Sequence, residues 1–118
     1  MIDITSRVEK FVSEVSAGEG ICVVFTGHTT CGLTINENSD HDVRSDMLGF
    51  LGRLIPQDEP HFRHFEGNAD AHIKASLMGS SVTVPIVDGR LALGRWQGIY
   101  LCEFDGPRSR EVVLHISK

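Results

Sequence analysis

The sequence lacks an excess of basic residues, a long apolar run and a targeting signal. Its formal net charge of −5 argues against nonspecific binding to nucleic acid, because that binding needs a basic surface to neutralise phosphates. No apolar segment approaches the roughly 20 residues that span a bilayer. The first residues, Met1 to Thr5, have no basic region and no signal-peptide core. We therefore expect a cytoplasmic protein with neither membrane nor nucleic-acid partners.

The chain also lacks paired cysteines and the common catalytic motifs. Cys22, Cys31 and Cys102 form no CxxC pair, so we expect free thiols in a reducing compartment. The P-loop, GxGxxG, GxSxG and HExxH signatures are all missing. A thiolate–imidazole pair of Cys31 with His28 is disfavoured, because residues three apart on an extended segment point to opposite faces.

What remains is the composition of an ordinary globular protein. The chain has 118 residues, of which 41% are hydrophobic and 23% are charged. This length suits one hydrophobic core, so we expect a single domain over residues 1–118.

The first half of the chain predicts two main helices that flank two strands. Val8, Phe11, Val12 and Val15 recur at helical spacing, and Ser6 with Glu9 has the spacing of a capping box. The continuously apolar run 21–25 predicts a strand buried on both faces, and the alternation in 33–36 predicts a second strand. A second helix is expected to begin near Ser39 or Asp40, with an apolar stripe made by Val43, Met47, Phe50, Leu51 and Leu54.

The second half predicts one short helix and then only strands. Asn68 is a candidate cap for a helix that carries Ile73 and Leu77. Asp88-Gly89 is typical of a two-residue hairpin turn. The strands expected there are 82–87, 91–94, 97–104 and 111–116. The pattern as a whole indicates an α+β fold with mostly antiparallel strands.

Two segments hold an unusual density of polar side chains. The segment 27–44 includes His28 and the loop Asn36-Glu37-Asn38, which lies between a strand and a helix. Turn and cap hydrogen bonds are the alternative explanation for Asn36, Asn38 and Ser39. We expect this segment and the segment 61–74 to meet in a single small-molecule site.

The segment 61–74 contains candidate metal ligands. His64, Asp70 and His72 carry the imidazole and carboxylate groups that suit zinc and similar ions. Exposure in a loop is the alternative for His61, which we favour, and for His64.

Two further positions suggest ligand binding. Arg108 follows Gly106-Pro107, in a turn that would present its planar donor group rigidly to an anion. Trp96 and Gln97 follow a glycine, where a tryptophan either joins the core or walls a pocket.

Taken together, these motifs resemble the YjbQ family, also known as secondary thiamine-phosphate synthases. The resemblance runs from about Ile2 to the C-terminus. Its motifs are His28-Thr29-Thr30, Thr34-Ile35-Asn36-Glu37-Asn38, Arg44 with Asp46, Glu66-Gly67-Asn68, His72-Ile73-Lys74-Ala75-Ser76-Leu77, Gly79-Ser80-Ser81, Pro85, Gly89-Arg90, Gly94 with Trp96-Gln97, and Gly106-Pro107-Arg108.

The resemblance implies two packed β-sheets with helices against them, and a homotrimer. It also implies a pocket near a subunit interface, built from the His28 motif, the Asn36-Glu37-Asn38 loop and the His72 motif. A divalent metal, zinc or magnesium, is implied in that pocket. We carry this over to His28, His64 and His72 as metal ligands, with Asp70 in reserve.

Two features depart from the family pattern. Family members usually begin with an additional strand before the segment that starts here at Ile2, and its loss would leave a sheet edge open. Arg95 stands where the family commonly has a small hydroxyl residue.

The implied activity joins a pyrimidine methyl pyrophosphate to a thiazole phosphate and releases pyrophosphate, so the expected partner is a small phosphorylated metabolite. Its catalytic candidates are Glu37, Asn38, Asp70 and Lys74, and its substrate-binding candidates are Asn36, Asn68, Ser80, Trp96, Gln97 and Arg108. One alternative is a metal-dependent hydrolase with Glu37 as general base. Another is a non-catalytic trimer clamped by metal.

Overall fold

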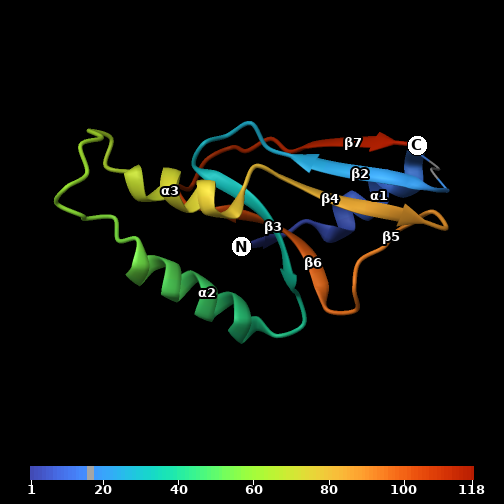
Figure 1. The fold of residues 1–118 in the computed structure, drawn as a ribbon, viewed down its shortest axis with the longest axis horizontal. Coiled ribbons are helices and arrows are strands. Elements are labelled where there is room, and N and C mark those ends of the chain that lie inside the picture. The colour runs from blue at the N-terminus through green and yellow to red at the C-terminus, as the bar shows by residue number, and fades with distance from the viewer. Residues whose placement is uncertain (16–17) are drawn as a thin grey trace.

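The fold of the chain is known from a computed structural model, which describes residues 1–15 and 18–118 (Figure 1). Within these residues, three helices and seven strands follow one another as β1 (Ile2–Asp3), α1 (Thr5–Val15), β2 (Gly20–Phe25), β3 (Cys31–Glu37), α2 (His41–Leu54), α3 (Ala69–Met78), β4 (Ser81–Val87), β5 (Arg90–Leu91), β6 (Gln97–Glu103) and β7 (Val113–Ser117).

The strands form two sheets in which each pair of neighbours is antiparallel. One sheet has the order β1-β6-β3, and the other has the order β5-β4-β2-β7. The predicted α+β fold with two mostly antiparallel sheets is thereby confirmed. No helix in the described part of the chain is long and apolar enough to cross a membrane.

The core lies between α1 and the inner faces of both sheets. Val8 and Val12 of the predicted stripe are buried there, beside Cys22 and Val24 of β2 and Leu33 of β3. Burial of this apolar surface is the main force that holds the elements together.

The start of α1 differs from the prediction. The helix begins at Thr5, and the Asp3 carboxylate accepts hydrogen bonds from the backbone amide and the hydroxyl of Thr5. The capping box of Ser6 and Glu9 was wrong, because Ser6 already lies inside the first turn and Asp3 occupies the free amide.

Two predicted burial patterns are also wrong. Ile21 and Phe25 of β2 are exposed on the outer face of their sheet, so this strand is buried on one face only. The helix α2 begins after its Asp40 cap as expected, but none of its residues is buried, and Phe50 and Leu54 are 58% and 60% exposed. The predicted face is apolar, but among the described residues it is covered only in part: Val43, Met47 and Leu51 are half-buried, whereas Phe50 and Leu54 are exposed.

The β4–β5 hairpin matches its prediction at the turn but not along its second strand. Asp88 and Gly89 both have positive φ angles, 52° and 77°, as a two-residue hairpin turn requires. The strand predicted over 91–94 ends at Leu91, because the Gly94 amide donates to the Gln97 side chain in a turn.

Helix α3 packs closely against β3, at the end of the molecule that lies farthest from β5 (Figure 1). Gly32 of β3 is buried against α3, and a Cβ built there would lie 2.7 Å from Cβ of Met78 and 3.1 Å from the carbonyl oxygen of Ala75. Only a residue without a side chain allows this approach. It holds the last turn of α3 against the first residues of β3.

Candidate functional site

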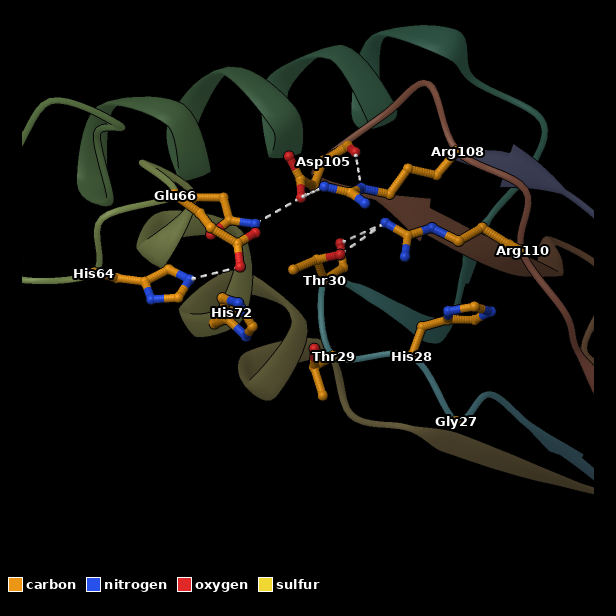
Figure 2. Close-up of a pocket in the computed structure, with 11 residues that line it drawn as sticks. Gly27, His28, Thr29, Thr30, His64, Glu66, His72, Asp105, Arg108 and Arg110 are labelled. Atoms are coloured by element: carbon orange, nitrogen blue, oxygen red, sulfur yellow. Dashed lines mark hydrogen bonds and ion pairs between the residues drawn. The ribbon is translucent and has the colours of Figure 1, made fainter.

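A cavity of about 370 Å³ opens where three loops meet the first turns of α3 (Figure 2). We call it the histidine–arginine cavity. Its lining residues are Gly27, His28, Thr29, Thr30, His64, Glu66, Asn68, His72, Asp105, Arg108 and Arg110. Five of the predicted site residues, His28, His64, Asn68, His72 and Arg108, are therefore brought together.

Arg108 is held in the cavity wall by the turn from which it projects. Its Nε donates to the Asp105 carbonyl oxygen and its Nη2 donates to Asp105 Oδ2, each at 2.9 Å. Asn68 Nδ2 donates to the same Oδ2 at 2.8 Å. The hydrogen bond from Asn68, followed by the nearby Arg108 charge, lowers the pKa of the Asp105 carboxyl. The rigid presentation predicted for Arg108 thus has a structural basis.

Asn68 stands at the N-cap position of α3 but does not cap the helix. Its amide nitrogen is turned to Asp105, and its Oδ1 is buried without a hydrogen-bond partner among the described residues. The first amides of α3 consequently receive no side-chain acceptor from Asn68, which leaves an N-terminal helix end with positive partial charge at the cavity.

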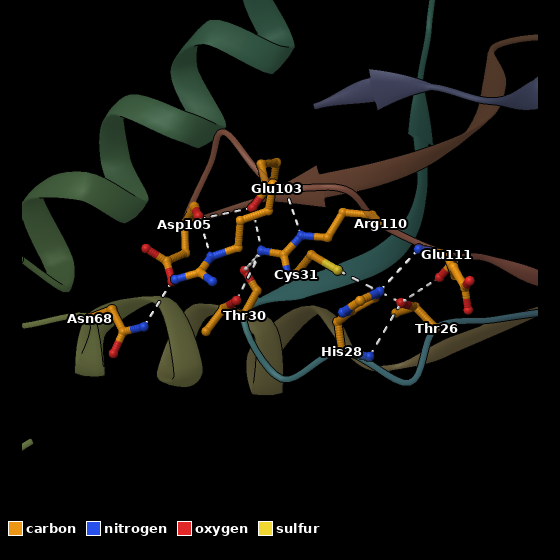
Figure 3. Close-up of polar contacts among 10 residues, drawn as sticks. Thr26, His28, Thr30, Cys31, Asn68, Glu103, Asp105, Arg110 and Glu111 are labelled. Atoms are coloured by element: carbon orange, nitrogen blue, oxygen red, sulfur yellow. Dashed lines mark hydrogen bonds and ion pairs between the residues drawn. The ribbon is translucent and has the colours of Figure 1, made fainter. Parts of the chain in front are cut away.

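A second arginine supports the wall from behind (Figure 3). The guanidinium of Arg110 makes two hydrogen bonds to the Glu103 carboxylate and also donates to the carbonyl and hydroxyl oxygens of Thr30. The hydrogen bond from Arg110 lowers the pKa of Glu103, and in turn Glu103 raises the pKa of Arg110. This partly buried pair connects the end of β6 to the β2–β3 loop.

The His28 ring is attached to the segment before β7. Its Nε2 accepts a hydrogen bond from the backbone amide of Glu111 at 3.0 Å. The carbonyl oxygen of Glu111 accepts a hydrogen bond from the hydroxyl of Thr26, which is buried. Glu111 thus accepts from one residue of the β2–β3 loop, Thr26, and donates to another, His28.

The other two histidines lie together on the opposite wall. The rings of His64 and His72 meet edge to face, with 5.4 Å between their centroids, and His64 Nε2 is 3.9 Å from a Glu66 oxygen. Figure 2 shows that His28 points away from this pair.

The three predicted metal ligands therefore share the cavity without converging on one point. No group of three or more His, Cys, Asp or Glu side chains in residues 1–15 and 18–118 is placed to hold a metal ion. The side chains as arranged do not fit a preformed metal site, and a bound zinc or magnesium ion stays a prediction.

Ser80 lies in a second cavity of about 450 Å³, which adjoins the first and shares His28, Thr29 and His72 with it. Asp70 and Lys74 line neither cavity. Asp70 is buried and Lys74 is partly buried on α3, where Lys74 Nζ donates to Asp70 Oδ2 at 2.8 Å. Within this chain they are therefore placed as a structural ion pair.

The remaining predicted residues lie at the far end of β3. The register pairs Cys31 with Glu103 beside the histidine–arginine cavity, but it pairs Glu37 with Gln97 at the other end of the same ladder. At a rise of about 3.3 Å per residue, the seven residues of β3 separate these ends by roughly 20 Å. Within a single chain, the first residues of segment 27–44 therefore meet segment 61–74 at the cavity as expected, but the loop 36–38 does not reach it.

At that far end the predicted residues mainly support local structure. Asn36 Nδ2 donates to Met47 Sδ, the Glu37 carbonyl oxygen accepts the Tyr100 hydroxyl, and Asn38 packs against Gly98. Trp96 is half exposed beneath the guanidinium of Arg95. Asn38 and Gln97 line a separate polar groove.

Glu103 and Asp105 were missed by the sequence analysis. Their hydrogen bonds, from Arg110 to Glu103 and from Asn68 to Asp105, are identified only once the chain is folded. With them, the cavity offers fixed guanidinium donors, three imidazoles and a helix N-terminus, a combination suited to an anion with acid–base groups nearby.

Comparisons of the sequence with known proteins all point to the same family. A family profile described as UPF0047 protein YjbQ-like matches residues 1–118. The UPF0047 protein MJ1081 of Methanocaldococcus jannaschii is 50% identical over 116 residues, which is 98% of this chain and 83% of that protein. The UPF0047 protein YugU of Bacillus subtilis is 51% identical over 110 residues, 93% of this chain and 83% of that protein.

Solved structures agree. An uncharacterised conserved protein of the YjbQ/UPF0047 family from Clostridium acetobutylicum superimposes with a TM-score of 0.95 at 53% identity, covering 98% of this chain and 89% of that one. A conserved hypothetical protein, TT1486 of Thermus thermophilus, gives 0.92 at 45% identity, covering 98% and 90%.

Proposed function

Since the chain belongs to the YjbQ-like UPF0047 family, we propose that it is an enzyme acting on a small phosphorylated metabolite bound in the histidine–arginine cavity. The reaction we propose is the one that the sequence resemblance implies, the condensation of a pyrimidine methyl pyrophosphate with a thiazole phosphate. The buried free thiols support the cytoplasmic location expected from the sequence.

The observation that carries this proposal is the fixed guanidinium of Arg108. Its contacts to Asp105 occupy Nε and one hydrogen of Nη2, so Nη1 and the second Nη2 hydrogen stay available at the cavity. A planar donor group held in one orientation recognises two phosphate oxygens at once.

The N-terminus of α3 supports the same ligand class. Helix N-termini favour anions through their free amides and the helix dipole, and Asn68 leaves this end uncapped. Asp105 and Glu66 place negative charge in the same wall, but Arg108 and Asn68 already engage the Asp105 carboxylate.

The proposed condensation forms a bond between the thiazole nitrogen and the pyrimidine methylene carbon, and breaks the carbon–oxygen bond to pyrophosphate, which leaves with the electron pair. Donors that stabilise the leaving pyrophosphate lower the barrier of such a step. Arg108, His28 and the Ser80 hydroxyl are the candidates here. The two adjoining cavities, of about 370 and 450 Å³, together offer room for both substrates.

The hydrolase alternative has less support. Its general base, Glu37, lies at the far end of β3 from the histidines, so water activated beside His72 would not reach Glu37 in one chain. Whether the protein binds a divalent cation is tested directly by measuring the metal content of the purified protein and of His72→Ala.

The predicted homotrimer is retained as a proposal. Ile21, Phe25 and Val113 form an exposed apolar row on the outer face of one sheet, and Leu48, Phe50 and Leu54 of α2 are also exposed. Exposed apolar patches of this kind are typical of surfaces that bind other proteins. Light scattering coupled to gel filtration measures the mass in solution.

The binding proposal is tested by calorimetry with thiazole phosphate on the wild type, Arg108→Lys and the control Arg53→Lys. Arg53 lies on α2, away from both cavities. We expect Arg108→Lys to weaken binding by about tenfold, because the ammonium group cannot make the paired contact. Equal affinities in all three proteins would reduce Arg108 to a turn residue.

A second assay tests the reaction itself. Pyrophosphate release is measured with both substrates present and with each alone. Binding without turnover would overturn the condensation and leave the phosphate site standing.

A further inference from the structure

The His28 ring accepts a hydrogen bond from a group that can only donate. Its Nε2 lies 3.0 Å from the backbone nitrogen of Glu111, and Figure 3 shows the ring turned toward that segment. Glu111 is itself restrained, because its carbonyl oxygen accepts the hydroxyl of the buried Thr26 at 3.1 Å. The contact therefore joins two well-held parts of the fold.

This contact determines where the imidazole proton is. A ring nitrogen that accepts from an amide carries no hydrogen, so a neutral imidazole must carry its proton on the other nitrogen. His28 is consequently the Nδ1–H tautomer. Nδ1 has no hydrogen-bond partner among residues 1–15 and 18–118, and His28 is a lining residue of both adjoining cavities.

We propose that His28 is a neutral hydrogen-bond donor, which gives its Nδ1–H to an oxygen atom of the bound ligand and is neither a metal ligand nor a general base. This role of His28 rests on the proposed function in one respect, which is that the ligand oxygen is a phosphate oxygen. It replaces the role of metal ligand that the sequence resemblance implied for this residue.

The exclusion of the other two roles follows from the lone pairs. A metal ligand or a base needs a free lone pair on a ring nitrogen. The Nε2 lone pair is directed at the Glu111 amide, and Nδ1 carries the proton. To serve in either role, the ring would have to release Glu111 and leave its amide without this partner.

The Glu111 contact can be removed and matched with a control at the same residue. Glu111→Pro deletes the amide hydrogen, whereas Glu111→Ala keeps it and alters only an exposed side chain. Glu111 lies before β7, so its amide is not part of the strand ladder.

The tautomer is read from long-range ¹H–¹⁵N correlation spectra of the labelled protein at pH 8, with His28→Ala to assign the signals. We expect His28 to be protonated on Nδ1 in the wild type and in Glu111→Ala, and to lose this preference in Glu111→Pro. Protonation on Nε2 in the wild type overturns the proposal. If Glu111→Pro does not fold, the wild-type and Glu111→Ala spectra still decide it.

The donor role is tested in the same spectra by titration with inorganic phosphate and, separately, with Zn²⁺. Phosphate is expected to shift the Nδ1–H signal, and His28→Ala to weaken phosphate affinity by about tenfold. A Zn²⁺-dependent shift of Nε2 overturns the assignment. Absence of phosphate binding by the wild type would overturn the proposed function, whereas a wrong tautomer would overturn the role of His28 alone.

Discussion

Replacement of Glu103 by glutamine tests whether the buried ion pair supports the cavity wall. The Arg110 side chain is only 7% exposed and that of Glu103 is 19% exposed, so loss of the carboxylate charge leaves a buried guanidinium without its counter-ion. Breaking such a pair costs about 3 to 5 kcal/mol. Because glutamine keeps one acceptor oxygen for Arg110, we expect Glu103→Gln to lower the free energy of unfolding by about 3 kcal/mol.

The assay is urea unfolding at a fixed protein concentration, so that any self-association affects all samples equally. Glu14→Gln is the matched control. Glu14 makes an exposed pair with Lys10 at 3.9 Å, and such pairs contribute at most about 1 kcal/mol. If Glu103→Gln lowers the free energy of unfolding no more than this control does, the reasoning is refuted.

The pH dependence gives a second check with a defined sign. The pKa of Glu103 is lowered in the folded protein, below its ordinary value of 4.5. A group of this kind contributes stability that is present above its unfolded pKa and is lost as the pH falls through its folded pKa. The difference in the free energy of unfolding between wild type and Glu103→Gln should therefore be largest near neutral pH and should shrink below pH 4.5.

Two further predictions concern packing and thiol chemistry. Gly32→Ala should lower the free energy of unfolding by about 1 to 3 kcal/mol in the same urea assay, because the new methyl group would lie 2.7 Å from the nearest side-chain carbon of α3. Gly52→Ala, in open space on α2, should be neutral or slightly stabilising, and equal effects of the two changes would contradict the packing account. Burial raises the pKa of the Cys102 thiol to about 11, so Ellman's reagent at pH 8 should label this residue only after unfolding; rapid labelling of the native protein would show that the core opens there.

Much of the fold follows from local signals. The stripe of α1, the Asp40 cap of α2 and the Asp88-Gly89 turn are each encoded within a few residues, and each is present in the structure. The apolar stripe of α2 shows the limit of this reasoning. Periodicity indicates which face of a helix is apolar, but it does not indicate what covers that face.

Sequence motifs predicted the lining residues correctly only where the fold brings those motifs to the same cavity. His28, Asn68, His72 and Arg108 come from three separate parts of the sequence, yet all line one cavity. The loop 36–38 looked equally functional, but the length of β3 places it at the opposite end of the ladder. Strand length and register are properties of the folded chain, and local composition does not reveal them.

The uncovered helix α2 has a consequence for how the native protein opens. A segment without buried side chains gains little from tertiary packing, so its amide hydrogens exchange with solvent through local fraying and do not wait for global unfolding. The amides of β2 and β6, at the centres of the two sheets, exchange only through larger openings. Any surface that comes to cover α2 will slow exchange there first, which makes this helix an internal reporter of association.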